Sequence, residues 1–494
     1  MSGGIEAPVS TWVLHPDRAL PADGPTREIA RRILARTANL PIVAMHGHVE
    51  AALLADDEPY LDPASLLVTP DHYLVRMIVS QATTPGPVRD SGVRSVADLG
   101  VGGSRGPRVE HDARTIWRRF CAAWPAFRGT PTRYWFEHVL STVFEAPCAP
   151  SPERADDLYD HLSERLSRPD YRPRALFERF GIEILATTDA ATSDLAAHAR
   201  LAADGWGGRV VPTFRPDPLF ETAHPDWKGQ LDALSAAADV DAHDYDGFLE
   251  ALRIQRRTFI AAGARATDHG HLSVDTTGLS HEAGRHLFRE AHRGDVTVNG
   301  AAAFTAHMLF QMAQMSADDG LVMQLHPGVL RDHDRRAATA YGHDTGYDIP
   351  VAAEFTRALR PVLEAFGHHE RFRLIAFTVD EDVYTRELAP LAGVYPALRL
   401  GAPWWFLDTP DAMRRFREAV TDTAGFANTS GFVDDTRAFC SIPARHDLSR
   451  RVDAGYLARL VAEHRLDLDE AVDAAEDLAY RLPLSSYPRP GGPA

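Results

Sequence analysis

The sequence predicts an α/β protein whose parallel strands close into a (β/α)8 barrel. Two observations support this prediction. Short apolar runs of the kind that form buried parallel strands recur eight times along the chain, and stretches with helical periodicity lie between most of them. Eight alternations favour closing the sheet into a barrel, and 494 residues are enough for one barrel with insertions.

Each of the eight runs is rich in Val, Ile or Leu, or ends in polar residues or glycine. They are residues 41–46, 182–187, 209–214, 264–268, 321–326, 372–378, 398–402 and about 430–433. A helix is expected over residues 194–204, after the second run, and another over 409–419, after the seventh. The latter begins with Thr409 as a cap and a proline in its first turn.

A long segment separates the first run from the second. It contains helix-like stretches over residues 112–124, 134–144 and 154–167, and a Gly-, Pro- and Ser-rich piece near 86–106. Because loops after barrel strands tolerate long additions, this segment predicts a helical insertion over the active-site face. The expected parts are an N-terminal segment with the first strand (1–46), the insertion (47–180), the rest of the barrel (181–448), and C-terminal helices with a loose tail that starts at Tyr487 (449–494).

Composition narrows the class of protein. A hydrophobic fraction of 45% and a charged fraction of 24% are typical of a globular protein, and a net charge of −17 argues against nucleic-acid or membrane-surface partners. No apolar run reaches the roughly 18 residues of a membrane span, and no signal peptide opens the chain. The three cysteines, Cys121, Cys148 and Cys440, are widely spaced and odd in number, which favours a cytoplasmic location.

Potential metal ligands follow the apolar runs. His46 and His48 close the first run, and residues i and i+2 of a strand face the same side. His326 closes the fifth run, and Asp435 follows the last. Imidazoles with one carboxylate suit zinc or a similar divalent ion. In isolation, His326 could equally be a core histidine and Asp435 a helix cap.

Arginines are the second feature of the strand ends. Arg215 closes the third run, Arg331 follows His326, and Arg437 follows Asp435. A guanidinium binds a carboxylate through two parallel hydrogen bonds, so these residues predict an acidic substrate. Other polar and aromatic residues expected at the barrel mouth are His72, Tyr73, Trp404, Trp405 and the segment Asp268-His269-Gly270-His271.

Taken together, these residues resemble the uronate isomerase family, also called glucuronate isomerases, a branch of the amidohydrolase superfamily. The similarity extends in one order from Pro41 to Leu448. Its motifs are His46-Gly47-His48, Asp71-His72-Tyr73, residues 129–135, Thr187-Thr188-Asp189, Arg215-Pro216-Asp217, Thr267-Asp268-His269-Gly270, Gln324-Leu325-His326 with Arg331, Trp404-Trp405-Phe406, and Asp435-Thr436-Arg437.

The resemblance implies a metal-dependent barrel of the amidohydrolase type that interconverts aldose and ketose hexuronates, D-glucuronate with D-fructuronate or D-galacturonate with D-tagaturonate. It also implies a homo-oligomer and one divalent ion, Zn²⁺ first, with Mn²⁺, Fe²⁺ and Co²⁺ as alternatives. The implied ligands are His46, His48, His326 and Asp435, the substrate contacts Arg215, Arg331 and one of Trp404 and Trp405, and the catalytic residues Asp435, Arg437, His72 and Tyr73.

The chain departs from the family pattern at Gly47, at Asp332-His333-Asp334 and at Asp380, which leaves the preferred sugar acid open. The expected mechanism is proton transfer through a cis-enediol, with Asp435, held by Arg437, as the base and a hydride shift as the rival. Two other functions compete: a metal-dependent amidohydrolase or lactonase, and an isomerase or epimerase of another acidic sugar. A catalytically inactive scaffold is disfavoured because every implied ligand is present.

Overall fold

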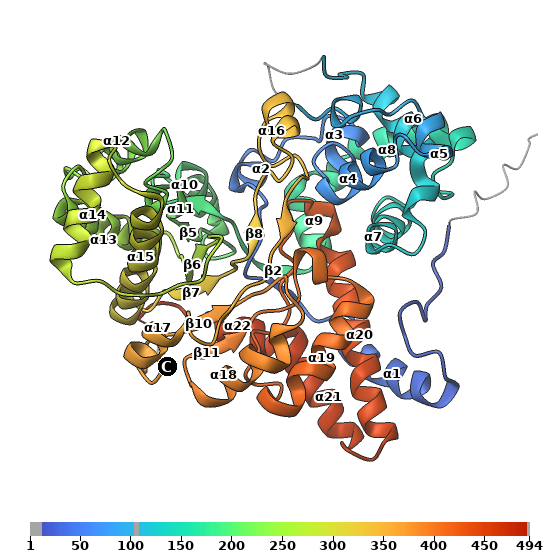
Figure 1. The fold of residues 1–494 in the computed structure, drawn as a ribbon. Helices are drawn as coiled ribbons and strands as arrows, with labels where there is room; N and C mark the ends of the chain where they lie inside the picture. Colours follow the sequence, from blue (N-terminus) through green and yellow to red (C-terminus); the bar gives the residue numbers. More distant parts are fainter. Residues whose placement is uncertain (1–11, 103–107, 492–494) are drawn as a thin grey trace, which may run out of the picture.

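Parallel strands lie at the centre of the computed structural model, which describes residues 12–102 and 108–491 (Figure 1). Hydrogen bonding orders them as β1-β2-β4 and β11-β10-β7-β6-β5-β3. Their bounds are β1 (Ile42–Ala44), β2 (Ile182–Ala186), β3 (Asp189–Ala190), β4 (Val210–Val211), β5 (Phe214–Arg215), β6 (Ala266–His269), β7 (Val322–Leu325), β10 (Leu374–Ala376) and β11 (Leu398–Leu400). A separate antiparallel hairpin pairs β8 (Val329–Leu330) with β9 (Ile349–Pro350).

The two sheets form one closed wall. β2 and β3 belong to one extended run, as do β4 and β5, and the ladder between the runs continues across the break: Thr187 N–H donates to Val211 O and Asp189 N–H to Thr213 O. The eighth run pairs with β11 through Thr429. It then meets the end of β1, because Asp435 N–H donates to His46 O at 3.1 Å. The predicted barrel is therefore confirmed.

The eighth run is less regular than the sequence predicts. Apart from the single bridge at Thr429, residues 430–433 form no strand. Gly431 has a φ of 70°, outside the extended region, and a side chain there would overlap the ring of Pro483. The positive φ interrupts the extended backbone that a strand requires.

Both faces of the barrel strands are buried, which explains why the runs are continuously apolar. Val43, Ile184 and Val322 lie in a cluster with other inward-facing residues, whereas Leu185 and Met323 pack outward against the surrounding helices. Parallel sheets covered on both sides have this composition.

Helices fill the long connection from β1 to β2, with the expected ones present as α6, as α7 continued by a π-helical turn, and as α8. Residues 103–107 of the Gly-, Pro- and Ser-rich piece lie outside the described residues. The helices are α2 (Ala51–Asp56), α3 (Pro63–Leu67), α4 (His72–Ser80), α5 (Pro87–Asp90), η1 (Val96–Leu99), α6 (Ala113–Ala123), η2 (Trp124–Phe127), α7 (Pro131–His138), η3 (Val139–Val143), η4 (Pro152–Arg154), α8 (Ala155–Leu166), η5 (Pro169–Tyr171) and α9 (Pro173–Arg179).

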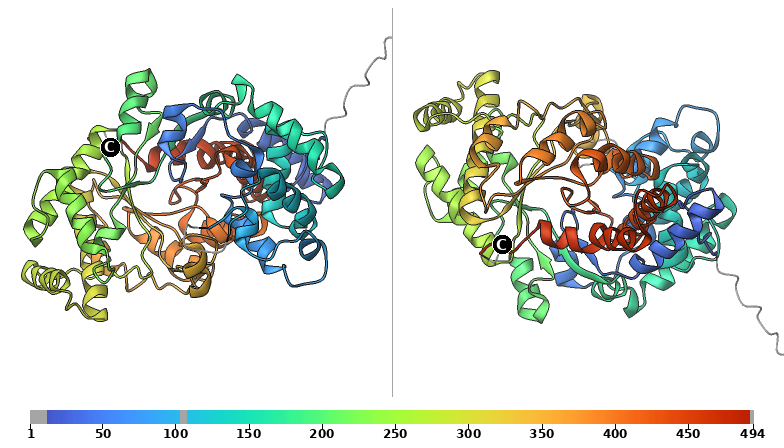
Figure 2. Two further views of the ribbon diagram at one scale, coloured as in Figure 1. Left: turned by 90° about the horizontal axis from the view of Figure 1, so that it is seen from above. Right: turned by 90° about the horizontal axis from the view of Figure 1, so that it is seen from below.

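The remaining helices surround the barrel, and in Figure 2 the insertion and the group α12–α15 lie on opposite sides of it. Among them, α19 is capped by Thr409 as predicted, because the Thr409 side chain accepts a hydrogen bond from Ala412 N–H. The first of these helices precedes β1 and the others follow β2. Their bounds are α1 (Gly24–Thr37), α10 (Ala196–Leu201), η6 (Ala202–Trp206), α11 (Asp217–Phe220), α12 (Trp227–Ala238), α13 (Tyr245–Ala261), α14 (His281–Arg293), α15 (Val298–Asp319), α16 (Arg335–Tyr341), α17 (Arg360–Phe366), η7 (Tyr384–Leu388), α18 (Ala389–Val394), η8 (Trp405–Leu407), α19 (Pro410–Ala424), η9 (Phe439–Ser441), α20 (Ile442–Ala462), α21 (Leu468–Glu476), η10 (Asp477–Arg481) and α22 (Leu482–Ser486).

The start of the C-terminal tail is packed, not loose. Tyr487 is fully buried in the barrel cluster, and its hydroxyl donates to Gln324 Oε1 at 2.8 Å. The expectation of a loose tail is therefore wrong at Tyr487, because its aromatic ring packs into the apolar cluster of the barrel. Residues 492–494, like 1–11, lie outside the described residues. Among the helices that are described, none combines the length and the apolar character needed to cross a membrane.

Candidate active site

A cavity of about 600 Å³ opens at the carboxyl ends of the barrel strands. Each residue that the sequence analysis assigned to catalysis, substrate binding or metal binding lines this cavity, except His46, which is buried next to it. These lining residues are His48, His72, Tyr73, Arg215, His326, Arg331, Trp404, Trp405, Asp435 and Arg437. Strand ends, the insertion and the β8–β9 hairpin all contribute, so the site exists only in the folded barrel.

His46, His48 and Asp435 form a triangle of potential metal ligands. Asp435 Oδ1 lies 3.3 Å from His46 Nε2 and 3.1 Å from His48 Nε2. Ligand atoms about 2.0–2.1 Å from a tetrahedral zinc ion are about 3.3 Å apart, so these separations fit one ion. Asp435 Oδ1 is buried without a hydrogen-bond partner in the described part of the chain. The triangle can therefore hold a divalent metal.

Negative charge at this position favours a cation. Burial lowers the pKa of His46, but the carboxylates of Asp268 and Asp435 outweigh burial and raise this pKa to about 9. For Asp435 the effects are reversed: burial alone would raise its pKa, but His46 and His48 hold the pKa far below the usual range of a carboxyl group. The same carboxylates that stabilise a proton on His46 would stabilise a metal ion in its place.

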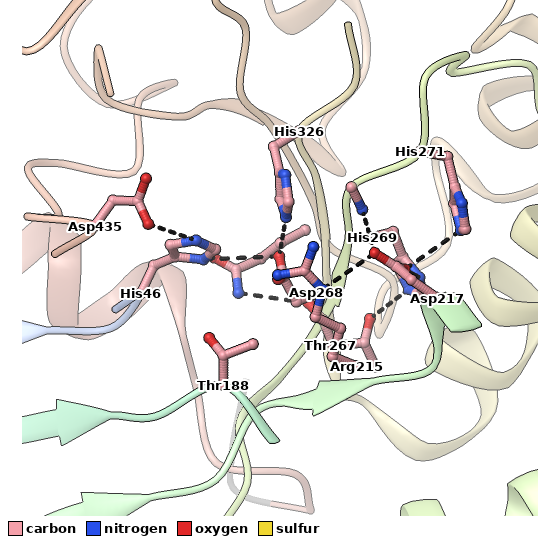
Figure 3. Close-up of polar contacts among 12 residues, drawn as sticks. His46, Thr188, Arg215, Asp217, Thr267, Asp268, His269, His271, His326 and Asp435 are labelled. Carbon is pink, nitrogen blue, oxygen red and sulfur yellow. Dashed lines mark hydrogen bonds and ion pairs between the residues drawn. The ribbon is translucent and has the colours of Figure 1, made fainter. Parts of the chain in front are cut away.

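His326 lies apart from this triangle. Its Nε2 is 2.6 Å from Asp268 Oδ1, and it groups with Asp268 and the other ring nitrogen of His46 (Figure 3). The two nitrogens of one imidazole point in different directions and cannot bind the same ion. The four predicted ligands are therefore close together but divided between two groups that share His46.

The backbone at Asp435 is strained, and the predicted contact between Asp435 and Arg437 is not formed. Asp435 has a φ of 40°, in the left-handed region that residues other than glycine rarely adopt. The prediction that Arg437 holds Asp435 is wrong: Arg437 hydrogen-bonds to His72 Nε2 at 3.2 Å and to Asp344 Oδ2 at 2.8 Å. Arg437 therefore lies against His72 of the insertion and Asp344, and not against Asp435.

All three predicted arginines are paired with carboxylates. Arg215 Nε donates to Asp217 Oδ2 at 3.1 Å, and its Nη1 is 3.4 Å from Asp268 Oδ2. Arg331 donates to Asp348 at 2.7 Å and lies over the ring of Trp405. Each guanidinium has five N–H groups, so donors remain for an anionic ligand.

The insertion contributes His72 and Tyr73, the first residues of α4. Burial and the charge of Arg437 lower the pKa of His72, so its imidazole is neutral at pH 7. Burial, followed by the charge of Asp408, raises the pKa of Tyr73 well above 10, so its hydroxyl keeps its proton. Arg437 can only donate, so His72 Nε2 accepts from it and the proton of the neutral ring is on Nδ1. The pair therefore offers two protons, one on His72 Nδ1 and one on the Tyr73 hydroxyl.

The two tryptophans have different surroundings. Trp404 is buried against His326, with ring centroids 5.0 Å apart, and its Nε1–H has no partner among the residues described. Trp405 has a φ of 54° and stacks on Phe406. Trp404 thus presents an unused donor near the metal triangle, whereas Trp405 supports Arg331.

Several residues of the site were not assigned a role from the sequence. Asp268 contacts Arg215 and His326, and Gln324 Oε1 accepts from His46 Nδ1 at 3.1 Å. Gly270 permits this packing, since a Cβ there would lie 2.5 Å from His326 Cε1 and 2.8 Å from Arg215 Nη2. Asp268 ends the fourth predicted strand run and Gln324 lies within the fifth, and a polar residue in an otherwise apolar run was the available signal. Of the departures from the family pattern, Asp332 lines the cavity.

Comparison with known families gives one result throughout. The family model described as glucuronate isomerase matches residues 25–485. A protein of Rhizobium meliloti named uronate isomerase is 50% identical over 478 residues, covering 96% of this chain and 99% of the relative. One of the same name from Rhizorhabdus wittichii is 50% identical over 474 residues, covering 96% of this chain and 98% of the relative.

Solved structures agree with the sequence matches. The crystal structure of glucuronate isomerase from Caulobacter crescentus superposes with a TM-score of 0.92 at 45% identity, covering 97% of this chain and 98% of that one. Uronate isomerase from Thermotoga maritima superposes with a TM-score of 0.86 at 24% identity, covering 96% and 100%, which supports the fold alone.

Proposed function

This chain belongs to the glucuronate isomerase family and is an isomerase, and we propose that its substrates are hexuronates. The reaction would interconvert D-glucuronate with D-fructuronate, D-galacturonate with D-tagaturonate, or both. One observation supports this proposal above the others: a single cavity is lined by His48 and Asp435 of the metal triangle, with His46 buried next to it, and by Arg215, Arg331 and Arg437. A metal ion held by the triangle would bind oxygens of a sugar chain, and the guanidinium groups would bind its carboxylate.

Arg215 and Arg331 are the proposed carboxylate clamp. Arg215 is fixed between Asp217 and Asp268, and Arg331 between Asp348 and the Trp405 ring, so both are oriented before substrate binds. Preoriented donors lose little entropy on binding. Trp404 Nε1–H would donate to a substrate oxygen, which assigns the substrate contact to Trp404 and the support of Arg331 to Trp405.

The proposed chemistry is proton transfer through a cis-enediol. Asp435, ionised at neutral pH, takes the proton from C2 and returns it to C1, while the proton of the C2 hydroxyl passes to the C1 oxygen. Neutral His72 and protonated Tyr73 are suited to that transfer between oxygens. Arg437 donates to His72 and so would fix its orientation.

A divalent metal ion, Zn²⁺ first, is proposed at His46, His48 and Asp435, with His326 close by. When bound, such an ion polarises and orients substrate oxygens. Mn²⁺, Fe²⁺ and Co²⁺ accept related ligand sets and stay as alternatives. Metal analysis of the purified protein, before and after substitution of Asp435, tests the assignment.

Nuclear magnetic resonance tests the reaction. The purified protein is incubated with D-glucuronate, with D-galacturonate, and with D-glucose as the matched sugar lacking a carboxylate. Ketouronate from at least one acid and no ketose from glucose is the expected result. Hydrolysis of a lactone or amide without any ketouronate would contradict the proposal. In D2O, solvent deuterium at C1 of the product supports the enediol, and its complete absence supports a hydride shift.

A cytoplasmic location and a homo-oligomer stay predictions. The unpaired thiols of Cys121, Cys148 and Cys440 are consistent with a reducing compartment. Size-exclusion chromatography with light scattering measures the oligomeric state directly.

A further inference from the structure

We propose that Asp217, His269 and His271 form a second divalent-cation site, separate from the His46, His48 and Asp435 triangle. The three side chains converge on the far side of Arg215 from His46 (Figure 3). They are 6%, 1% and 8% exposed, respectively, and none of them lines the active-site cavity. The site would therefore hold its ion beside the catalytic centre and not within it.

The unpaired atoms of this cluster are its strongest feature. Asp217 Oδ1 lies 3.3 Å from His271 Nε2 and 3.8 Å from His269 Nδ1, and all three atoms lie within 4.8 Å of one another. None of the three has a hydrogen-bond partner in the described part of the protein. Buried polar atoms without partners are costly, so three that face one point indicate a missing ligand.

The other polar atoms of the same groups are already paired. Asp217 Oδ2 accepts from Gly270 N–H at 2.9 Å and from Arg215 Nε at 3.1 Å, and His269 Nε2 hydrogen-bonds to Thr267 Oγ1 at 3.0 Å. Such contacts orient metal ligands in known sites. These hydrogen bonds hold the Asp217 carboxylate and the His269 ring in place, with the free Oδ1 and Nδ1 atoms facing the centre of the cluster.

The sequence repeats a ligand pattern here. His269-Gly270-His271 closes β6 with the same tripeptide as His46-Gly47-His48 at the end of β1. In both places an aspartate from a neighbouring segment completes the group. Two imidazoles and one carboxylate suit Zn²⁺. Ligand atoms of a tetrahedral ion are about 3.3 Å apart, against 3.3 Å from Asp217 Oδ1 to His271 Nε2 and 3.8 Å to His269 Nδ1, so binding would draw His269 slightly inward. The ring of Phe220 stacks near both histidines and closes one side.

The ion would position Arg215. Asp217 divides its two oxygens between the cluster and Arg215, so an ion on Oδ1 would hold the carboxylate that orients the guanidinium. The cluster is thus a positioning site for the active-site arginine.

Metal counting in the full-length protein tests this inference. Protein produced with added zinc is passed over a desalting column and analysed by mass spectrometry for metal per chain. We expect two zinc ions in the unchanged protein, one in His271→Asn, one in Asp435→Asn and none in the double variant. His307→Asn is the matched control, because both ring nitrogens of buried His307 are already hydrogen-bonded. It should retain two ions.

The outcomes separate this site from the first. A double variant that binds as much zinc as Asp435→Asn alone would overturn the proposal, as would an unchanged count in His271→Asn. If His271→Asn does not fold by circular dichroism, His269→Gln replaces it. Cobalt gives a second readout: Co²⁺ bound to Asp435→Asn should give visible absorption bands that disappear in the double variant. None of these measurements depends on the isomerase reaction, so they stand even if the proposed substrates are wrong.

Discussion

Arg215 is held by carboxylates on two sides, Asp217 at 3.1 Å and Asp268 at 3.4 Å. We predict that Arg215→Lys raises KM for a hexuronate about tenfold, or about 1.4 kcal/mol, with a smaller change in kcat, because an ammonium cannot form the two-point contact. Steady-state kinetics measures both constants. Arg360→Lys, on a surface helix, is the control and should leave them unchanged. An unaltered KM in Arg215→Lys would remove Arg215 from the clamp.

His307 makes stability depend on pH. Burial lowers its pKa to about 4, and Leu279 N–H donates to Nδ1, so the folded protein keeps the ring neutral. Below the ordinary pKa of about 6.5 the unfolded chain gains a proton that the folded chain does not, so stability falls between pH 6.5 and 4. The expected loss from this group is on the order of 3 kcal/mol at pH 4.

Denaturant unfolding at a series of pH values measures this dependence. His307→Gln should have a shallower slope of unfolding free energy between pH 6.5 and 4 than the unchanged protein. Equal slopes in the two proteins would assign the dependence to other groups.

At the scale of elements, the β8–β9 hairpin and the connection within it bring acids to the substrate arginines. Asp344 accepts from Arg437 at 2.8 Å and is half exposed. Asp344 neutralises part of the positive charge that Arg437 adds to the cavity, and so weakens the attraction of a substrate carboxylate to the clamp of Arg215 and Arg331. Partly exposed ion pairs contribute up to about 1 kcal/mol, so Asp344→Asn should lower KM for a hexuronate by roughly two- to fivefold with kcat little changed. A higher KM would contradict this electrostatic account of Asp344.

The segment after α22 links the C-terminus to the metal triangle. Tyr487 donates to Gln324 Oε1, which also accepts from His46. Tyr487→Phe removes one buried hydrogen bond and should destabilise the protein by about 1–2 kcal/mol. Tyr480→Phe loses a half-buried bond to Glu183 and should cost less, about 0.5 kcal/mol. Chemical denaturation measures both variants, and equal losses would show that the Gln324 contact has no special weight.

Across the whole molecule, the features that the sequence predicted are those that local patterns determine, namely the strand runs and the residues at their ends. Burial on both faces produces the apolar runs, and the barrel they imply brings His46, Arg215, His326 and Asp435 to one end. Hydrogen bonds between individual side chains far apart in the sequence could not be predicted. Tyr487 and Gln324 are 163 residues apart, and no local pattern signals their contact. Arg437 and His72 are 365 residues apart, and their contact likewise depends on the folded barrel.

The central claim is that this cavity isomerises a hexuronate with Asp435 as its base. The most direct measurement follows the conversion of D-glucuronate by nuclear magnetic resonance with the unchanged protein and with Asp435→Asn, after circular dichroism has shown that both are folded. We predict ketouronate from the unchanged protein and at least a thousandfold less from the variant, about 4 kcal/mol of lost transition-state stabilisation. Equal turnover by Asp435→Asn would contradict the account.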